Sequence, residues 1–150
     1  MSFQINRKKF FHLNETYKTS SPEETFAFGK AFAGKLKAND ILLLEGDLGV
    51  GKTVFTKGLA EGLGILRTVK SPTFNIVKEY DGSLKLYHFD LYRIEDPEEL
   101  FEIGFEGYLS AGGVCVIEWP QIANEYIPED VLHITIERDG ADARTITIAR

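Results

Sequence analysis

The chain has 150 residues, 43% of them hydrophobic, which is long enough for one folded domain and short for two. Its 23 acidic and 17 basic side chains give a formal net charge of −6, which argues against a surface that binds nucleic acid or an anionic membrane. A single cysteine, Cys115, excludes an internal disulfide and a cysteine-cluster metal site. No apolar stretch is long enough to span a membrane. We therefore expect one cytoplasmic domain over residues 1–150, without membrane binding or strong direct nucleic-acid binding.

The first half of the chain has the pattern of an α/β unit. Residues 1–20 are polar and are predicted to form an irregular N-terminal segment. Ser21, followed by Pro-Glu-Glu, is typical of a helix start, and apolar residues at helical spacing carry the predicted helix toward Asn39. The apolar run 41–44 predicts a strand that is buried on both faces. A glycine-rich turn then leads into a second amphipathic helix, which ends among the glycines at 62–64.

The second half of the chain is richer in strands. Segments 73–80 and 84–89 are separated by Asp-Gly-Ser, which predicts an antiparallel hairpin. A second capped helix start lies at Asp96, and that helix is expected to close near Gly104. The remaining extended segments are 114–117, 131–137 and 144–149, the last two joined by a turn-rich stretch. These elements predict an α/β fold in which helices pack on a mixed sheet.

Residues 46–53 match the phosphate-loop pattern Gly-x-x-x-x-Gly-Lys-(Ser/Thr) in every required position. Glycines let backbone N–H groups turn toward a phosphate, and the helix that begins near Lys52 adds its positive end. Lys52 supplies a charge for the β- and γ-phosphates, and the Thr53 hydroxyl can ligate Mg²⁺. The predicted phosphate-binding residues are Asp47, Leu48, Gly49, Val50, Gly51, Lys52 and Thr53.

A phosphate-loop enzyme needs a further carboxylate at a strand end to hold Mg²⁺ directly or through water. Asp90 follows the strand pattern 86–89, and Glu118 follows the fully apolar run 114–117. Glu118 has the cleaner strand, whereas Asp is the more usual residue on the metal side, so either is a candidate for the direct ligand. The alternative for each is a strand-end acid exposed to water.

Five short motifs occur in one order and together carry a resemblance. They are Gly46–Gly49, Lys70–Thr73, Tyr87–Arg93, Asp96–Leu100 and Ile117–Trp119. Their succession closely resembles the TsaE family (also called YjeE), over nearly the whole chain from about Ser21 to the closing hairpin. The resemblance implies a single-domain P-loop NTPase fold, whose mixed sheet has a parallel centre, antiparallel hairpin strands and flanking helices.

The resemblance also implies a function in bacterial tRNA threonylcarbamoyladenosine synthesis. A TsaE protein is expected to bind and hydrolyse ATP with Mg²⁺, and to support turnover by TsaB and TsaD as they modify the adenosine beside the anticodon. The roles that it implies are catalysis by Lys52, Asp90 and Glu118, Mg²⁺ binding by Thr53, Glu118 and Asp90, a γ-phosphate switch at Ser71 and Thr73, and a place beside the nucleotide for Arg144.

Three neighbouring residues have alternative interpretations. His88 is either a hydrogen-bonded structural histidine, the commoner case, or a catalytic group. Arg93 pairs either with a phosphate or partner carboxylate, or with an acid on the surface. Trp119 serves either packing or partner contact.

Other phosphate-loop proteins are the competing functions. No Asn-Lys-x-Asp motif is present, which disfavours a GTPase. A small-molecule kinase usually carries a lid with several arginines, but the six arginines here are scattered along the sequence. A nucleotide-switched binding module with little hydrolysis is the third possibility. Because no internal arginine finger is evident, we expect hydrolysis to be slow without partners.

Overall fold

The computed structural model describes residues 14–70, 72 and 75–150. Over these residues a seven-stranded sheet has the order β1-β7-β6-β2-β5-β4-β3. The strands are β1 (Asn14–Thr19), β2 (Ile41–Glu45), β3 (Val77–Tyr80), β4 (Leu86–Asp90), β5 (Val114–Glu118), β6 (Leu132–Arg138) and β7 (Arg144–Ala149). The helices are α2 (Pro22–Phe32), α3 (Lys52–Gly62), α4 (Glu98–Glu102) and α5 (Phe105–Leu109), with 3-10 helices η1 (Ala33–Lys35) and η2 (Pro120–Tyr126).

The centre of the sheet is parallel and its edges are antiparallel. Strand β2 runs parallel to both β5 and β6, and β4 runs parallel to β5. Strand β3 pairs antiparallel with β4 on one side, and β7 and β1 add antiparallel strands on the other. The expected α/β fold, with a mixed sheet, a parallel centre and antiparallel hairpin strands, is therefore confirmed.

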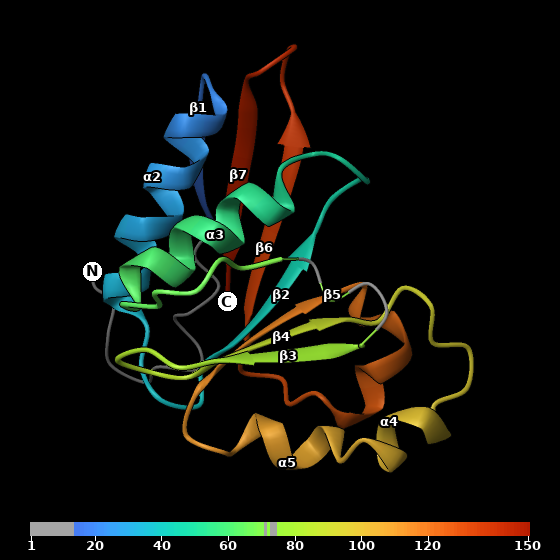
Figure 1. Ribbon diagram of the computed structural model, residues 1–150. Helices are drawn as coiled ribbons and strands as arrows, with labels where there is room; N and C mark the ends of the chain where they lie inside the picture. The colour runs from blue at the N-terminus through green and yellow to red at the C-terminus, as the bar shows by residue number, and fades with distance from the viewer. Residues whose placement is uncertain (1–13, 71, 73–74) are drawn as a thin grey trace, which may run out of the picture.

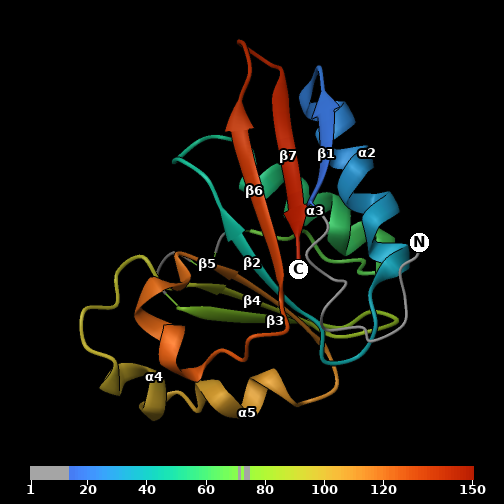
Figure 2. The ribbon, with the colours of Figure 1, turned by 180° about the vertical axis from the view of Figure 1, so that it is seen from behind.

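Helices cover both faces of the sheet (Figures 1 and 2). On one face, Leu42 of β2 belongs to a core cluster with Phe55 of α3, and α2 lies against α3. On the other face, Ile41 belongs to a second cluster with Leu100 of α4 and Phe105 of α5. Because neighbouring residues of β2 point to opposite faces and both faces are covered, this strand is apolar without alternation.

The prediction that residues 1–20 are irregular is wrong for residues 14–19, which form β1. This strand lies at the edge of the sheet and pairs with β7 along its whole length. Within residues 15–19, Tyr17 is half-buried and Thr19 is buried, while Glu15 and Lys18 are exposed. The strand is held mainly by backbone hydrogen bonds, so its side chains carry almost no apolar pattern. Residues 1–13 lie outside the described residues.

The first helix begins as predicted but ends early. The Ser21 hydroxyl accepts a hydrogen bond from the Glu24 N–H at 3.1 Å, and the Glu24 carboxylate accepts one from the Ser20 N–H at 2.7 Å. Helix α2 ends at Phe32, and the short helix η1 with an extended Leu36 follows it, so the predicted continuation to Asn39 is wrong. Leu36 still packs against the core, which explains its apparent helical spacing.

Two further boundaries differ from the prediction. Strand β3 begins at Val77, after a left-handed Ile76 (φ 65°), so residues 75 and 76 of the predicted strand 73–80 are not part of it, and residues 73 and 74 lie outside the described residues. Helix α4 ends near Gly104 as expected, but α5 and η2 were not predicted. Gly104 has a φ of 72° and separates α4 from α5, whose own Gly107 lowers helix propensity.

Candidate functional site

The phosphate-loop residues connect β2 to α3 through a backbone that requires glycine. Gly46, Gly49 and Gly51 have φ values of 155°, 76° and 115°. A Cβ at Gly46 would lie 2.6 Å from the Ile136 carbonyl oxygen, so a side chain there is also excluded by space. The sharp loop therefore depends on these glycines, because other residues would be strained.

Helix α3 begins with backbone donors that no side chain caps. Its N-cap is Gly51, and no side-chain oxygen accepts from the first turn. The first intrahelical bond runs from the Phe55 N–H to the Gly51 carbonyl at 3.0 Å. The N–H groups that precede Phe55 therefore lack intrahelical acceptors at the positive end of an 11-residue helix. This arrangement suits an anion, and a phosphate in particular.

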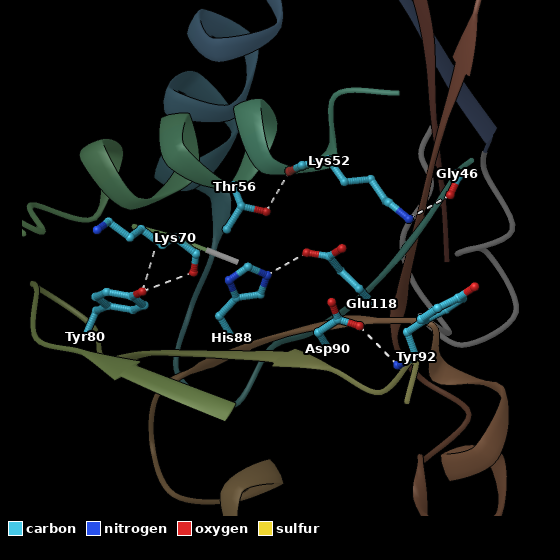
Figure 3. A network of polar contacts seen from close by, with 9 residues as sticks. All are labelled: Gly46, Lys52, Thr56, Lys70, Tyr80, His88, Asp90, Tyr92 and Glu118. Carbon is cyan, nitrogen blue, oxygen red and sulfur yellow. Dashed lines mark hydrogen bonds and ion pairs between the residues drawn. The ribbon is translucent and has the colours of Figure 1, made fainter. Parts of the chain in front are cut away.

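Lys52 is buried beside this helix start, with 6% of its surface exposed. Its Nζ donates to the Gly46 carbonyl oxygen at 2.7 Å (Figure 3). The same Nζ lies 4.3 Å from the centre of the Trp119 ring. The charged end thus rests between the loop backbone and an aromatic face. Trp119 reaches this place because its left-handed φ of 55° turns the chain directly after β5.

Two carboxylates lie opposite this lysine, at the ends of neighbouring parallel strands. Asp90 of β4 and Glu118 of β5 are direct register partners, and Figure 3 shows them side by side. One oxygen of Asp90 accepts the Tyr92 N–H at 3.0 Å. Because parallel strands end at the same edge of a sheet, both acids face the loop that follows β2.

Glu118 is held by a buried histidine. His88 Nε2 lies 2.7 Å from Glu118 Oε2, and His88 is 0% exposed. In the described part of the chain, the other ring nitrogen, Nδ1, has no hydrogen-bond partner. A buried N–H without an acceptor is more costly than a nitrogen lone pair without a donor, so we assign the proton to Nε2. His88 then donates to Glu118 Oε2, and Glu118 Oε1 remains for another partner.

One cavity of about 490 Å³ brings these groups together. Its lining comes from the phosphate loop, the start of α3 and the ends of β4 and β5. The lining residues are Leu48, Gly49, Gly51, Lys52, Thr53, Val54, Asp90, Tyr92, Arg93, Glu118 and Trp119. The cavity therefore combines backbone donors, a lysine, a hydroxyl and two carboxylates, which is the set of groups that binds a phosphate together with a hard cation.

Two arginines donate hydrogen bonds to the backbone of the loop. Arg144 Nε donates to the Val50 carbonyl at 2.6 Å, and Arg138 Nη2 donates to the Gly49 carbonyl at 3.2 Å. Arg144 also lines a smaller hollow beside the loop, of about 170 Å³. Both guanidinium groups are thus engaged with backbone carbonyls of the phosphate loop.

Comparisons with known proteins agree on one family. A family model described as "Threonylcarbamoyl adenosine biosynthesis protein TsaE" matches residues 19–146. The chain is 53% identical over 132 residues to the tRNA threonylcarbamoyladenosine biosynthesis protein TsaE of Bacillus subtilis (strain 168), covering 87% of this chain and 82% of the relative. The chain belongs to the TsaE family. The corresponding protein of Rickettsia bellii is 41% identical over 138 residues, covering 91% and 95%.

A solved structure supports the same assignment. The crystal structure of YdiB from Bacillus subtilis has a TM-score of 0.79 to this chain at 47% identity, and the match covers 91% of this chain and 86% of that one. The resemblance to TsaE proteins, inferred from five short motifs, is therefore confirmed. TsaE proteins belong to tRNA threonylcarbamoyladenosine biosynthesis.

The structure brings most of the predicted site residues of this TsaE family member together. Lys52, Thr53, Asp90 and Glu118 line the one cavity, and Arg144 donates to the Val50 carbonyl of the loop. The predicted switch residues Ser71 and Thr73 lie outside the described residues. No helix in the described part of the chain is long and apolar enough to cross a membrane.

Sequence reasoning left open or missed several contacts. Trp119, considered for packing or partner contact, lies in the cavity against Lys52 and Tyr92. The ring centroids of Trp119 and Tyr92 are 4.9 Å apart. Arg93 lines the same cavity. Arg138 was not singled out, and its position in a turn-rich hairpin carried no signal for a loop contact. The arginines that are scattered in sequence are thus partly gathered around the loop in space.

Proposed function

We propose that the chain binds ATP with Mg²⁺ in the phosphate-loop cavity and hydrolyses it in the cytoplasm, as a component of the tRNA threonylcarbamoyladenosine machinery that works with TsaB and TsaD. One observation carries this proposal: the cavity joins the uncapped start of α3 and Lys52 to the paired carboxylates Asp90 and Glu118. This combination suits a bound phosphate chain, its cation and a reacting water.

The geometry supports a role for each group. The backbone donors of the loop and the first turn of α3 would bind the phosphates, and Lys52 would leave the Gly46 carbonyl to contact them. When Mg²⁺ is bound, it would neutralise charge on the transferred phosphoryl group. Thr53 and Glu118 would hold it, and Asp90 would act on the metal side or orient the attacking water.

The donor set fits Mg²⁺ in a nucleotide complex and does not form an all-protein cage. In the described part of the chain, no group of three His, Cys, Asp or Glu side chains is placed to hold a metal ion. Magnesium commonly keeps waters and takes one or two carboxylates together with phosphate oxygens. One oxygen of each carboxylate is already engaged, by His88 for Glu118 and by the Tyr92 N–H for Asp90. Each acid thus has one oxygen to offer.

The positions of the arginines support slow hydrolysis by the isolated chain. Arg138 and Arg144 donate to carbonyls of the loop, so each would have to leave that contact to stabilise charge on the γ-phosphate, and Arg93 is the arginine that lines the cavity. We expect TsaB and TsaD to complete the site. The acidic net charge of −6 agrees with a protein that contacts ATP and protein partners while others hold the tRNA.

The test measures phosphate release from ATP by the chain alone and with TsaB and TsaD, in parallel with a multiple-turnover tRNA modification assay. We expect a slow rate alone, a faster rate with the partners, and modification beyond one turnover only when the chain is present. An ATPase rate that the partners leave unchanged would contradict the proposed activation.

Binding and hydrolysis can be separated because Trp119 is the one tryptophan and lies in the cavity. Its fluorescence should change when ATP displaces the Lys52 side chain from the ring, and GTP should have a weaker effect. Binding without phosphate release, even with the partners, would favour the nucleotide-switched module instead. Transfer of the phosphoryl group to a metabolite in place of water would favour the small-molecule kinase.

A further inference from the structure

The acidic charge of the chain is concentrated in one segment. Residues 94–132 contain ten of the 23 acidic side chains and none of the 17 basic ones, nor any histidine. Glu118 is buried in the phosphate-loop cavity, and the other nine acids are exposed or half-buried. These nine are Glu95, Asp96, Glu98, Glu99, Glu102, Glu106, Glu125, Glu129 and Asp130. The rest of the chain, with thirteen acids against 17 bases, is weakly basic.

Helices α4 and α5 of this segment lie on the face of the sheet opposite α2 and α3 (Figures 1 and 2). Side chains of the segment line an apolar hollow there. The hollow has a volume of about 150 Å³ and lies between α4, α5 and η2. We call it the acidic groove, and it is lined by Leu100, Phe101, Gly104, Phe105, Glu106, Gly107 and Tyr126. It shares no lining residue with the phosphate-loop cavity, so it is a separate surface.

The acidic groove presents apolar surface that the fold does not cover. Phe101 is 81% exposed, although its neighbours Leu100 and Phe105 are each 1% exposed. A Cβ placed on Gly104 or Gly107 would meet no atom within 4 Å, so the groove is open at both positions. Covering an exposed phenylalanine ring is favourable by about 25 cal/mol per Å² of apolar surface removed from water. The ring is therefore suited to bury against another molecule.

The carboxylates beside the acidic groove determine which charge a bound molecule should carry. Among the described residues, no lysine or arginine forms an ion pair with Glu102, which follows Phe101 directly, or with Glu106, which lines the groove. Unpaired carboxylates attract lysine and arginine and repel phosphate groups, so RNA and an anionic membrane are disfavoured. We propose that the acidic groove docks a protein partner through a segment that presents an apolar side chain between lysine or arginine residues.

The test uses the full chain and a labelled probe, a short helical peptide of leucine and lysine, with binding followed by fluorescence anisotropy at physiological salt. Two control peptides separate the contributions: one replaces leucine with serine at the same charge, and the other replaces lysine with glutamate. We expect the Leu/Lys peptide to bind about tenfold or more tightly than either control, because both burial and charge are needed.

The variant Gly107→Glu distinguishes docking in the groove from a purely electrostatic attraction of the peptide. It places a side chain at the open wall of the groove and adds a negative charge, and the backbone there is not left-handed. Docking in the groove predicts that Gly107→Glu weakens Leu/Lys peptide binding about tenfold, whereas a purely electrostatic attraction predicts tighter binding. Phe101→Ser should weaken binding similarly without disturbing the core, because the ring is exposed.

A charge-reversal pair completes the design. Glu102→Lys should weaken binding, and the matched Glu137→Lys, at an exposed position of β6 that does not line the groove, should not. Circular dichroism and thermal melting establish that each variant is folded. Equal binding of the Ser/Lys peptide, or undiminished binding by Gly107→Glu, overturns the proposal. Sedimentation of the chain alone gives a further check: self-association that Phe101→Ser abolishes would show that a second copy occupies the groove instead.

Discussion

His88 Nε2 donates a hydrogen bond to Glu118 Oε2 across 2.7 Å, between side chains that are 0% and 6% exposed. The histidine lies within β4 and the glutamate at the end of β5, so the bond joins two parallel neighbours in the sheet. His88 is bonded to Glu118 Oε2, and both residues are fixed by the pairing of β4 with β5. The direction of the second oxygen, Glu118 Oε1, is therefore set by the sheet. His88 is thus a positioning residue for an acid of the phosphate-loop cavity.

Replacing His88 with leucine should lower the kcat of ATP hydrolysis by roughly 10–100-fold, the usual effect of removing such a support, while changing nucleotide affinity little. His88→Gln is the matched control, because its amide can donate a hydrogen bond near the place of Nε2, and it should retain much of the activity. Phosphate release and Trp119 fluorescence measure the two quantities, with thermal melting to check folding. Equal losses in the leucine and glutamine variants would show that the hydrogen bond is not responsible.

Lys52→Ala should abolish ATP hydrolysis and repeated tRNA modification, with a loss of at least about 10²-fold, because the phosphates lose their buried positive partner. The fold should persist, since the lost contacts are one hydrogen bond to the Gly46 carbonyl and one ring contact. Lys57→Ala, on the exposed side of the same helix, is the control and should keep wild-type rates. Modification through many cycles by Lys52→Ala would refute the assigned role.

The contact between α2 and α3 depends on glycine. A Cβ at Gly58 of α3 would overlap the carbonyl oxygen of Phe26 in α2, and backbone atoms have little freedom to move apart. Gly58→Ala should therefore lower the free energy of unfolding by about 1–3 kcal/mol or more, measured by urea denaturation. Gly34→Ala is the control: its Cβ would meet nothing within 4 Å, so we expect no loss of stability. Equal stability of the two variants would contradict the close approach of the helices.

Burial raises the pKa of the Cys115 thiol to about 12, from an ordinary value of 9.0. The folded chain should then hold about 10³-fold less thiolate than an exposed cysteine at the same pH, and react slowly with thiol reagents. The contribution of the protonated thiol to the free energy of unfolding is fully present below about pH 9, and it disappears as the pH rises toward 12. Labelling of native and urea-unfolded chain at pH 8 measures the difference. Rapid stoichiometric labelling of the native chain would contradict the burial.

Features whose chemistry is local were predictable from the sequence. The phosphate loop at 46–53 is one contiguous pattern, and its glycines, lysine and threonine act through their own backbone and side chains. The buried strands 41–44 and 114–117 could be recognised because strands covered on both faces are continuously apolar. The succession of motifs was enough to indicate the TsaE family, and with it Asp90 and Glu118.

Features that depend on a distant partner were not predictable. Strand β1 forms because β7 offers it an edge, and its own residues are mostly polar. Arg138 reaches the loop only because the hairpin of β6 and β7 passes beside it, whereas a place for Arg144 beside the nucleotide was expected from the resemblance. Phe101 looked like an ordinary apolar position of a helix, and only the packing of α4 and α5 leaves it exposed.

By itself, the sequence determined that this protein has a phosphate loop between a buried strand and a helix, since every group in that motif lies within eight consecutive residues. It also determined the charge imbalance of residues 94–132, which is a matter of composition. Only the tertiary structure decided that His88 holds Glu118, 30 positions away, because that contact arises from parallel pairing of β4 with β5. It likewise decided that the acidic segment surrounds an open apolar groove, because exposure depends on which neighbours the fold supplies.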